Sequence, residues 1–149
     1  MSSPFLSAAE IYRRIPHSGT MRLLAGVTFW DDSSIVCSAT SHTEIDNPLR
    51  DNGILANVNA LEYAAQAITV HGSLLMADAA ELKLVYVATF RGVDMHPGAL
   101  DQRGDTALTI SATRVGALAN GWNYEFTVAA QDLVLAQGKT VVVAPGVAT

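Results

Sequence analysis

The pattern of apolar and polar residues divides the chain into one long helical stretch and several strand-like stretches. Residues 54–77 are apolar on almost every side when they are placed at about 3.6 residues per turn, apart from one narrow polar stripe. Glu62 is the only charged residue in this stretch. The stripe consists of Glu62 together with Asn59, Gln66, Thr69 and Ser73. Because such a helix is normally buried, we expect the stripe to face a cleft or a partner subunit.

Two shorter patterns precede this helix. Ser7 and Glu10 have the spacing of a capping box, which predicts a helix of about two turns that ends at Pro16. Residues 22–30 and 34–41 are rich in apolar residues and flank a pair of aspartates. This pattern predicts two antiparallel strands joined by a tight turn.

Apolar and polar residues alternate through most of the chain beyond the helix, which predicts strands with one buried face. The strand-like blocks are residues 82–92, 105–117 and 122–144. The last block is long enough for two strands, with a division near Asp132 or Gly138. Residues 43–53 contain Pro, Gly, two Asn and two Asp, so they predict an irregular loop before the helix.

Together these elements predict an α+β fold in a single domain that spans residues 1–149. One long central helix would be wrapped by a curved antiparallel β-sheet of about five to six strands. The alanines at positions 56, 60, 64 and 67 would let the sheet approach the helix axis closely. Because such a sheet has exposed edges, we expect a dimer or a larger oligomer rather than a monomer.

The composition limits the classes of function. Half of the residues are apolar and 15% are charged, which is typical of one soluble, compact domain. The net charge of −5, with the basic residues scattered, argues against a nucleic-acid partner. Cys37 is the only cysteine, which fits a reducing, cytoplasmic compartment. We expect no signal peptide, and polar side chains in residues 54–77 would be costly in a bilayer, so we expect no membrane contact.

Three segments, in this order and at this spacing, resemble the hotdog-fold dehydratases that act on 3-hydroxyacyl groups of acyl carrier protein. The segment at residues 15–27 is IPHSGTMRLLAGV, which resembles the family's opening LPHxxPMLLLDRV. Residues 60–67 are ALEYAAQA, similar to the central helix motif xxExMAQ, and residues 135–143 are LAQGKTVVV, similar to LAxGxxxV. The NPL sequence at residues 47–49 resembles the subgroup associated with aryl polyene synthesis.

The resemblance implies a hotdog fold and a role in fatty acid or polyene type lipid synthesis. Its substrate would be an acyl thioester on phosphopantetheine, carried by acyl carrier protein or coenzyme A, and no cofactor or metal would be needed. The two sheets of a dimer would join edge to edge, with active sites between the subunits. The partner would be a second copy of the chain or another hotdog subunit. The family's acid and glutamine correspond to Glu62 and Gln66.

The chain departs from the family at the usual catalytic histidine. No histidine lies between Pro48 and Glu62, where the family has a longer loop that carries one. We therefore take His17, in the PH turn of the first motif, as the first candidate base. His42 and His71 are the next candidates, although the position of His71 on the helix predicts that it faces the sheet.

Dehydration needs a base, an acid and donors that stabilise negative charge on the thioester oxygen. Neutral His17 could be the base. The apolar neighbours of Glu62 would disfavour its charged form, so that it could act as a protonated acid. The proposed donors are the unpaired backbone N–H groups at the helix start, with Asn59 and Gln66 beside them. These backbone groups belong to Ala56, Asn57 and Val58.

Three alternatives remain open from the sequence. Glu62 could be a structural acid paired with Arg22, with Arg50 or with the polar helix stripe of a dimer mate, and His17 could simply hydrogen-bond the backbone of its turn. The protein could be an acyl thioesterase in which Glu62 activates water. It could also be a non-catalytic subunit that binds acyl chains or supports an active partner.

Overall fold

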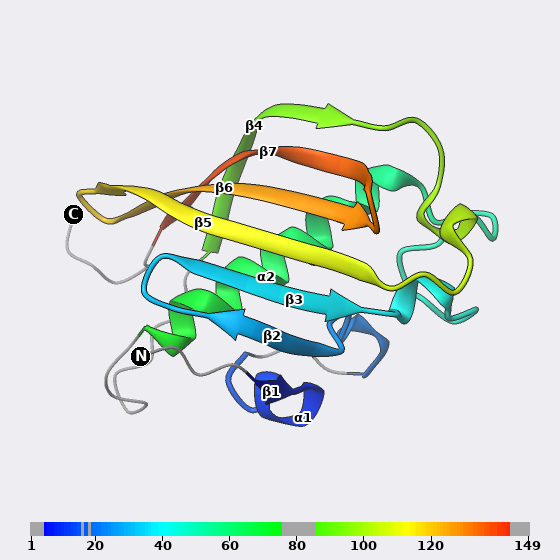
Figure 1. Cartoon of the computed structure of the whole chain (residues 1–149), viewed down its shortest axis with the longest axis horizontal. Coiled ribbons are helices and arrows are strands. Elements are labelled where there is room, and N and C mark those ends of the chain that lie inside the picture. The colour runs from blue at the N-terminus through cyan, green and yellow to red at the C-terminus, as the bar shows by residue number, and fades with distance from the viewer. Residues whose placement is uncertain (1–4, 16, 18, 76–85, 144–149) are drawn as a thin grey trace.

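The computed structural model describes residues 5–15, 17, 19–75 and 86–143, in which one long helix lies against a curved antiparallel sheet (Figure 1). This is the α+β architecture that the sequence predicts. The strands are β1 (Leu6–Ser7), β2 (Gly26–Trp30), β3 (Ser34–Ala39), β4 (Tyr86–Met95), β5 (Leu108–Leu118), β6 (Gly121–Ala130) and β7 (Leu133–Val143). The helices are α1 (Ala8–Ile11) and α2 (Ala60–Leu74), with 3₁₀ turns at Gly19–Met21, Ser41–Thr43, Asn57–Asn59 and Leu100–Arg103.

The sheet has the strand order β1-β2-β3-β5-β6-β7-β4, and every pairing in it is antiparallel. The described residues thus form seven strands, more than the five to six expected, and the shortest is β1 with two residues. The β2–β3 hairpin is the predicted one, and Asp31 closes its turn by accepting from the backbone N–H groups of Ser33 and Ser34. β4 forms the edge opposite β1.

The last strand-like block divides beside Asp132, at a turn in which Gln131 has a φ of 52°. Gly138, the alternative division point, lies inside β7 instead. A Cβ at position 138 would approach Cα of Val93 to 3.0 Å, at the irregularity between Arg91 and Asp94 in β4. The glycine therefore allows β4 to pass closely over β7 rather than ending the strand.

The central helix is shorter than the predicted 54–77 stretch. Residues 54–56 are not helical, because a distant segment binds the backbone around them. Leu55 O accepts from Leu100 N at 2.7 Å, and Asn57 N donates to Gly98 O at 3.0 Å. Residues 76 and 77 of the prediction lie outside the described part of the chain. Of the four alanines predicted to lie under the sheet, those at 60, 64 and 67 are fully buried, whereas Ala56 precedes the helix and is half-buried.

The N-terminal capping box is confirmed, but the helix that it starts is short. Glu10 N donates to Ser7 Oγ at 3.2 Å, and Ser7 N donates to Glu10 Oε1 at 2.9 Å. α1 has four residues rather than two turns, because Arg14 N donates to Ile11 O at 2.9 Å and tightens the chain into a turn.

His71 is buried and contacts the sheet, as the sequence predicts. Its Nε2 lies 2.8 Å from Asp31 O and its Nδ1 lies 2.6 Å from the Tyr124 hydroxyl. A carbonyl can only accept, so Nε2 carries the proton and Nδ1 accepts from Tyr124. Arg114 Nε donates to the same hydroxyl at 3.1 Å. The buried thiol of Cys37 has its pKa raised to about 12 by desolvation, which makes it an inert core residue.

The backbones of β6 and β7 approach each other closely at Gly121, and this contact gives a test of the register of the two strands. A Cβ at Gly121 would lie 1.9 Å from Val142 O, whereas a Cβ at Gly116 would meet only Asn123 Nδ2 at 3.6 Å. We expect Gly121→Ala to lower the free energy of unfolding by about 2 kcal/mol or more, and Gly116→Ala to cost much less. Urea denaturation of both variants measures the difference, and equal stabilities would contradict this register.

Candidate functional site

Glu62 lies in the first turn of α2 and its side chain is exposed. It forms no ion pair with the described residues, so the proposed structural pairing with Arg22 or Arg50 is not present within this subunit. Arg50 binds Asp101 instead, at 2.7 Å. The apolar enclosure that the sequence predicts for Glu62 is therefore not supplied by its own subunit.

His17 lies between α1 and β2 and is half-buried. Its ring meets the Tyr12 ring edge-on, with centroids 6.5 Å apart, and its carbonyl oxygen accepts from Arg22 Nε at 2.9 Å. Nδ1 is enclosed and has no hydrogen-bond partner among the described residues. Burial lowers the pKa of His17 below 6.5, and the charge of Glu62 partly opposes this shift. The contacts of Tyr12 with the His17 ring and with Gln66 bring His17 to the side of α2 that carries Glu62, and burial keeps the imidazole neutral near pH 7.

Gln66 lies one turn beyond Glu62 but is only 2% exposed. Its Oε1 accepts from the Tyr12 hydroxyl at 2.6 Å and from Leu23 N at 3.2 Å. Its Nε2 donates to Met21 O at 2.7 Å. In this arrangement both polar atoms of the side-chain amide are bound to the segment between α1 and β2.

The helix start holds the other predicted substrate-binding groups. Asn57 N donates to Gly98 O at 3.0 Å, and its side-chain Nδ2 donates to His96 O at 2.7 Å, so neither is directed at a ligand. Ala56 pairs with Ala99 in an isolated bridge, and Asn59 Nδ2 donates to Ala56 O at 3.1 Å. Val58 is 53% exposed, about one turn before Glu62.

The remaining histidine candidates lie apart from Glu62. His42 is fully buried, and neither of its ring nitrogens has a hydrogen-bond partner among the described residues. Burial lowers the pKa of His42, which the backbone of Thr106 partly offsets; the charges nearby are Arg50 and Asp101. Burial likewise lowers the pKa of His71. His17 is thus the candidate that the fold brings near Glu62.

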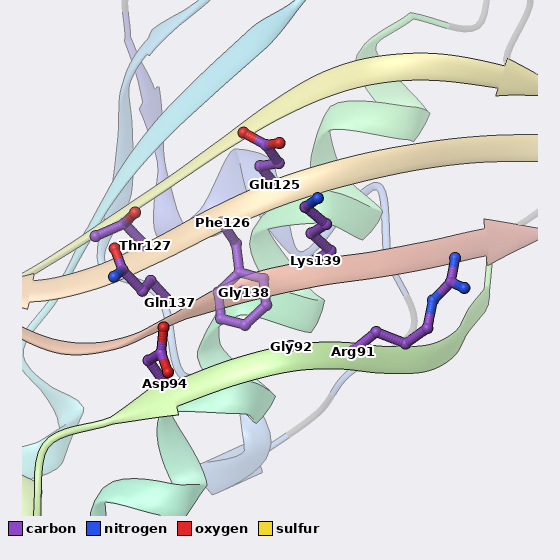
Figure 2. A pocket seen from close by; sticks show the side chains of 9 residues that line it. All are labelled: Arg91, Gly92, Asp94, Glu125, Phe126, Thr127, Gln137, Gly138 and Lys139. Carbon is purple, nitrogen blue, oxygen red and sulfur yellow. The ribbon is translucent and has the colours of Figure 1, made fainter.

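Among the hollows in the surface of the described residues are two whose linings can be compared with the positions of Glu62 and His17. The larger, about 710 Å³, lies on the sheet at β4, β6 and β7, and Figure 2 shows its lining side chains. It contains neither Glu62 nor His17. The smaller, about 280 Å³, lies beside residues 19–22, which follow His17 in the chain. It is lined by Gly19, Thr20, Arg22, Ser41, Glu44, Asp46 and Asn47.

The described part of the chain has neither a metal-binding cluster nor a membrane-spanning helix. No three His, Cys, Asp or Glu side chains there are grouped so that they could hold a metal ion. None of the helices there is both long and apolar enough to span a bilayer.

Tyr12 and Arg22 are the two site residues whose roles the sequence does not indicate. The carbon at the centre of the Arg22 guanidinium lies 5.4 Å from the centroid of the Tyr12 ring. Tyr12 is 7% exposed, and a buried tyrosine needs a hydrogen-bond partner for its hydroxyl. The tyrosine itself is therefore the one feature of the sequence that indicates a buried polar contact here. Nothing in the local pattern identifies that partner as Gln66, which is 54 residues away.

The chain is similar to one known protein family and to several solved structures. A model of the ApeP-like family, described as ApeP dehydratase, matches residues 9–149. No curated protein matches the chain. A structure of the dehydratase heterocomplex ApeI:P from Xenorhabdus doucetiae is 24% identical, with a TM-score of 0.78 over 92% of this chain and 91% of the other.

Two further solved structures are similar over most of the chain. AziG from S. sahachiroi is 17% identical, with a TM-score of 0.61 over 81% of this chain and 90% of the other. The thioesterase HI1161 from Haemophilus influenzae is 12% identical, with a TM-score of 0.62 over 93% and 92% of the two chains. These likenesses confirm the predicted hotdog fold.

Buried histidines with lowered pKa values predict acid sensitivity. His42 and His71 bind protons more weakly in the folded than in the unfolded state, so their contribution to stability is complete above pH 6.5 and is lost as the pH falls below it. The loss is at most about 1.4 kcal/mol per pH unit for each histidine. Because neither ring nitrogen of His42 has a partner at hydrogen-bonding distance, and only the nearby Thr106 backbone favours its protonated form, His42→Leu should reduce this acid dependence at little cost near neutral pH.

Urea denaturation at about pH 7.5 and about pH 5.5 measures this dependence. The control is His96→Gln, since His96 is exposed. An unchanged acid dependence in His42→Leu would show that His42 does not resist protonation in the folded protein.

Proposed function

Because the chain belongs to the ApeP-like dehydratase family, we propose that it removes water from a 3-hydroxyacyl thioester carried on the phosphopantetheine arm of an acyl carrier protein. It is a dehydratase-like protein of the hotdog fold. The observation that supports the proposal is that Tyr12 contacts the His17 ring and also binds Gln66, one turn along α2 from Glu62, so that His17 and Glu62 come from matching motifs joined by one set of contacts. We place this activity in the cytoplasm.

In the proposed reaction, neutral His17 removes the proton from C2 of the acyl group, next to the thioester carbonyl. The electrons of that C–H bond form the C2–C3 double bond, and the C3–O bond breaks. Protonated Glu62 gives its proton to the departing hydroxyl, which leaves as water. His17 then holds one proton and Glu62 lacks one, so transfer between them restores the starting state.

The thioester oxygen needs a donor as negative charge develops on it. The start of α2 is the proposed source, because the first backbone N–H groups of a helix have no partner inside it. Asn57 N donates to Gly98 O, Asn59 N donates to Ala56 O and Ala60 N donates within the turn, so we assign this role to the N–H of Val58, in the 3₁₀ turn that leads into α2.

A partner subunit would complete the site. Glu62 is exposed, and three large apolar residues, Ile54, Val58 and Met95, are 56%, 53% and 37% exposed in this subunit. β4 is an edge strand of ten residues that pairs only with β7 among the described residues. We propose that a second hotdog subunit covers this region and joins the sheet at β4. The likeness to the heterocomplex ApeI:P supports a different dehydratase subunit as this partner.

Hydrolysis of an acyl thioester is the second candidate function. It is favoured by the exposure of Glu62 to water, which the carboxylate could activate for attack on the thioester carbon. The likeness to the thioesterase HI1161 fits this candidate but carries less weight, because the two chains are 12% identical. Release of a free acid and a thiol, instead of water, distinguishes the two reactions.

We expect Glu62→Gln to reduce dehydration at least about 100-fold, because an amide cannot transfer the proton. The assay follows loss of water by mass from a 3-hydroxyacyl carrier protein, with the chain alone and mixed with a second dehydratase subunit. Glu125→Gln is the control, since Glu125 is an exposed glutamate that lies on β6 and not on α2. Normal turnover by Glu62→Gln in both settings would contradict the proposed acid.

We expect Val58→Asp to weaken subunit association at least about tenfold, because a carboxylate beside Glu62 would have to lose its water in the interface. Val115→Asp is the matched control, since Val115 is 52% exposed and lies on β5. Light scattering over a concentration series measures association of the chain alone and with the second subunit. Equal effects of the two variants would argue against an interface at the helix start.

A further inference from the structure

Tyr12 attaches the segment that carries His17 to helix α2. Its hydroxyl donates to Gln66 Oε1 at 2.6 Å and accepts from Leu24 N at 2.8 Å. Burial raises the pKa of Tyr12 to about 12, so the hydroxyl keeps its proton at working pH. One atom of Tyr12 therefore binds both the helix that carries Glu62 and the chain that enters β2.

Tyr12 also contacts His17 in two ways. The two rings meet edge-on, with centroids 6.5 Å apart and planes at 68°. The guanidinium of Arg22 lies over the Tyr12 ring at 5.4 Å, and Arg22 Nε donates to His17 O at 2.9 Å. The tyrosine thus contacts the imidazole directly and its backbone through Arg22.

We propose that Tyr12 is a positioning residue that holds the imidazole of His17 in a fixed orientation towards the carboxylate of Glu62. The connection runs from the Tyr12 hydroxyl to Gln66, which lies four residues beyond Glu62 on α2 and so on the same side of the helix. This inference rests on the proposed function in taking His17 and Glu62 as partners. Its physical basis is that a small displacement of a reacting group lowers the rate steeply.

A second buried tyrosine, Tyr63, gives a matched comparison because it has no ring contact with His17. The hydroxyl of Tyr63 makes contacts of 2.8 Å with Ser41 Oγ and 3.1 Å with Asn47 Nδ2. Tyr63 is next to Glu62 in the chain and is fully buried, yet it forms no ring contact with His17. The two tyrosines have the same number of hydroxyl contacts and differ in their relation to His17.

Tyr12→Phe keeps the ring and removes the hydroxyl, so the segment should loosen and the His17 ring should become better hydrated. We expect the pKa of His17 to rise towards its ordinary value by at least about half a unit. Proton NMR titration of the histidine-labelled full chain measures the shift, with His17→Gln to assign the signal. Glu62 and Arg22, the charged groups around His17, are unchanged. With the second subunit present, kcat should fall about tenfold with little change in KM.

Tyr63→Phe loses the same number of hydroxyl contacts and should leave the His17 titration where it is in the wild type. An unshifted His17 in Tyr12→Phe, or an equal shift in Tyr63→Phe, would overturn the positioning role. Gln66→Leu removes the same anchor from the helix side and must move the pKa of His17 in the same direction. If Tyr12→Phe does not fold, the His17 titration in Gln66→Leu decides whether the positioning role is correct.

The titration and the turnover assay separate this inference from the proposed function. If His17→Gln retains full turnover while Tyr12→Phe shifts the His17 titration, the proposed base is wrong and the positioning of the ring stands. If His17→Gln loses turnover and Tyr12→Phe leaves the titration unchanged, the proposed base stands and the positioning role is wrong.

Discussion

The side-chain amide of Gln66 is the interaction on which the arrangement of the candidate site depends. It is 2% exposed, and it binds a tyrosine hydroxyl, a backbone N–H and a backbone carbonyl, all from residues 12–23. A buried amide that loses a partner costs about 1–3 kcal/mol, so the segment that supplies these partners has a defined place on α2. The position of His17 follows from that place, because His17 lies within the anchored segment. A glutamine whose polar atoms are all bound within the subunit can therefore be as necessary to the site as the residues that react.

The anchored segment covers one part of the polar stripe on α2 and leaves another open. Gln66 and Ser73 are buried, whereas Glu62 is exposed. The same region exposes Val58, and β4 has an unpaired edge among the described residues. A single subunit thus encloses part of the His17 ring but leaves the Glu62 side chain exposed to water.

Much of the fold could be predicted from the sequence, because alternation and helical periodicity are local properties. The β2–β3 hairpin, the buried alanines of α2 and the contact of His71 with the sheet are all confirmed. The predicted start of the central helix, at residue 54, is wrong because Gly98 and Leu100 hydrogen-bond the backbone of Asn57 and Leu55. These partners are more than forty residues away in the chain, so a local pattern does not reveal them. Similarly, periodicity places Gln66 beside Glu62 but cannot say that Tyr12 and Leu23 will cover only the glutamine.

The exposure of Glu62 determines what the partner must contribute. In water, a charge acts weakly on an imidazole nearby, because the high dielectric constant screens it, and here Glu62 only partly opposes the effect of burial on His17. A surface that excludes water over the pair would strengthen their interaction several-fold and couple their protonation. It would also keep bulk water from competing for the protons that they transfer. The chain's own contacts therefore set the geometry of the pair, and the covering subunit sets the environment in which that geometry becomes useful for chemistry.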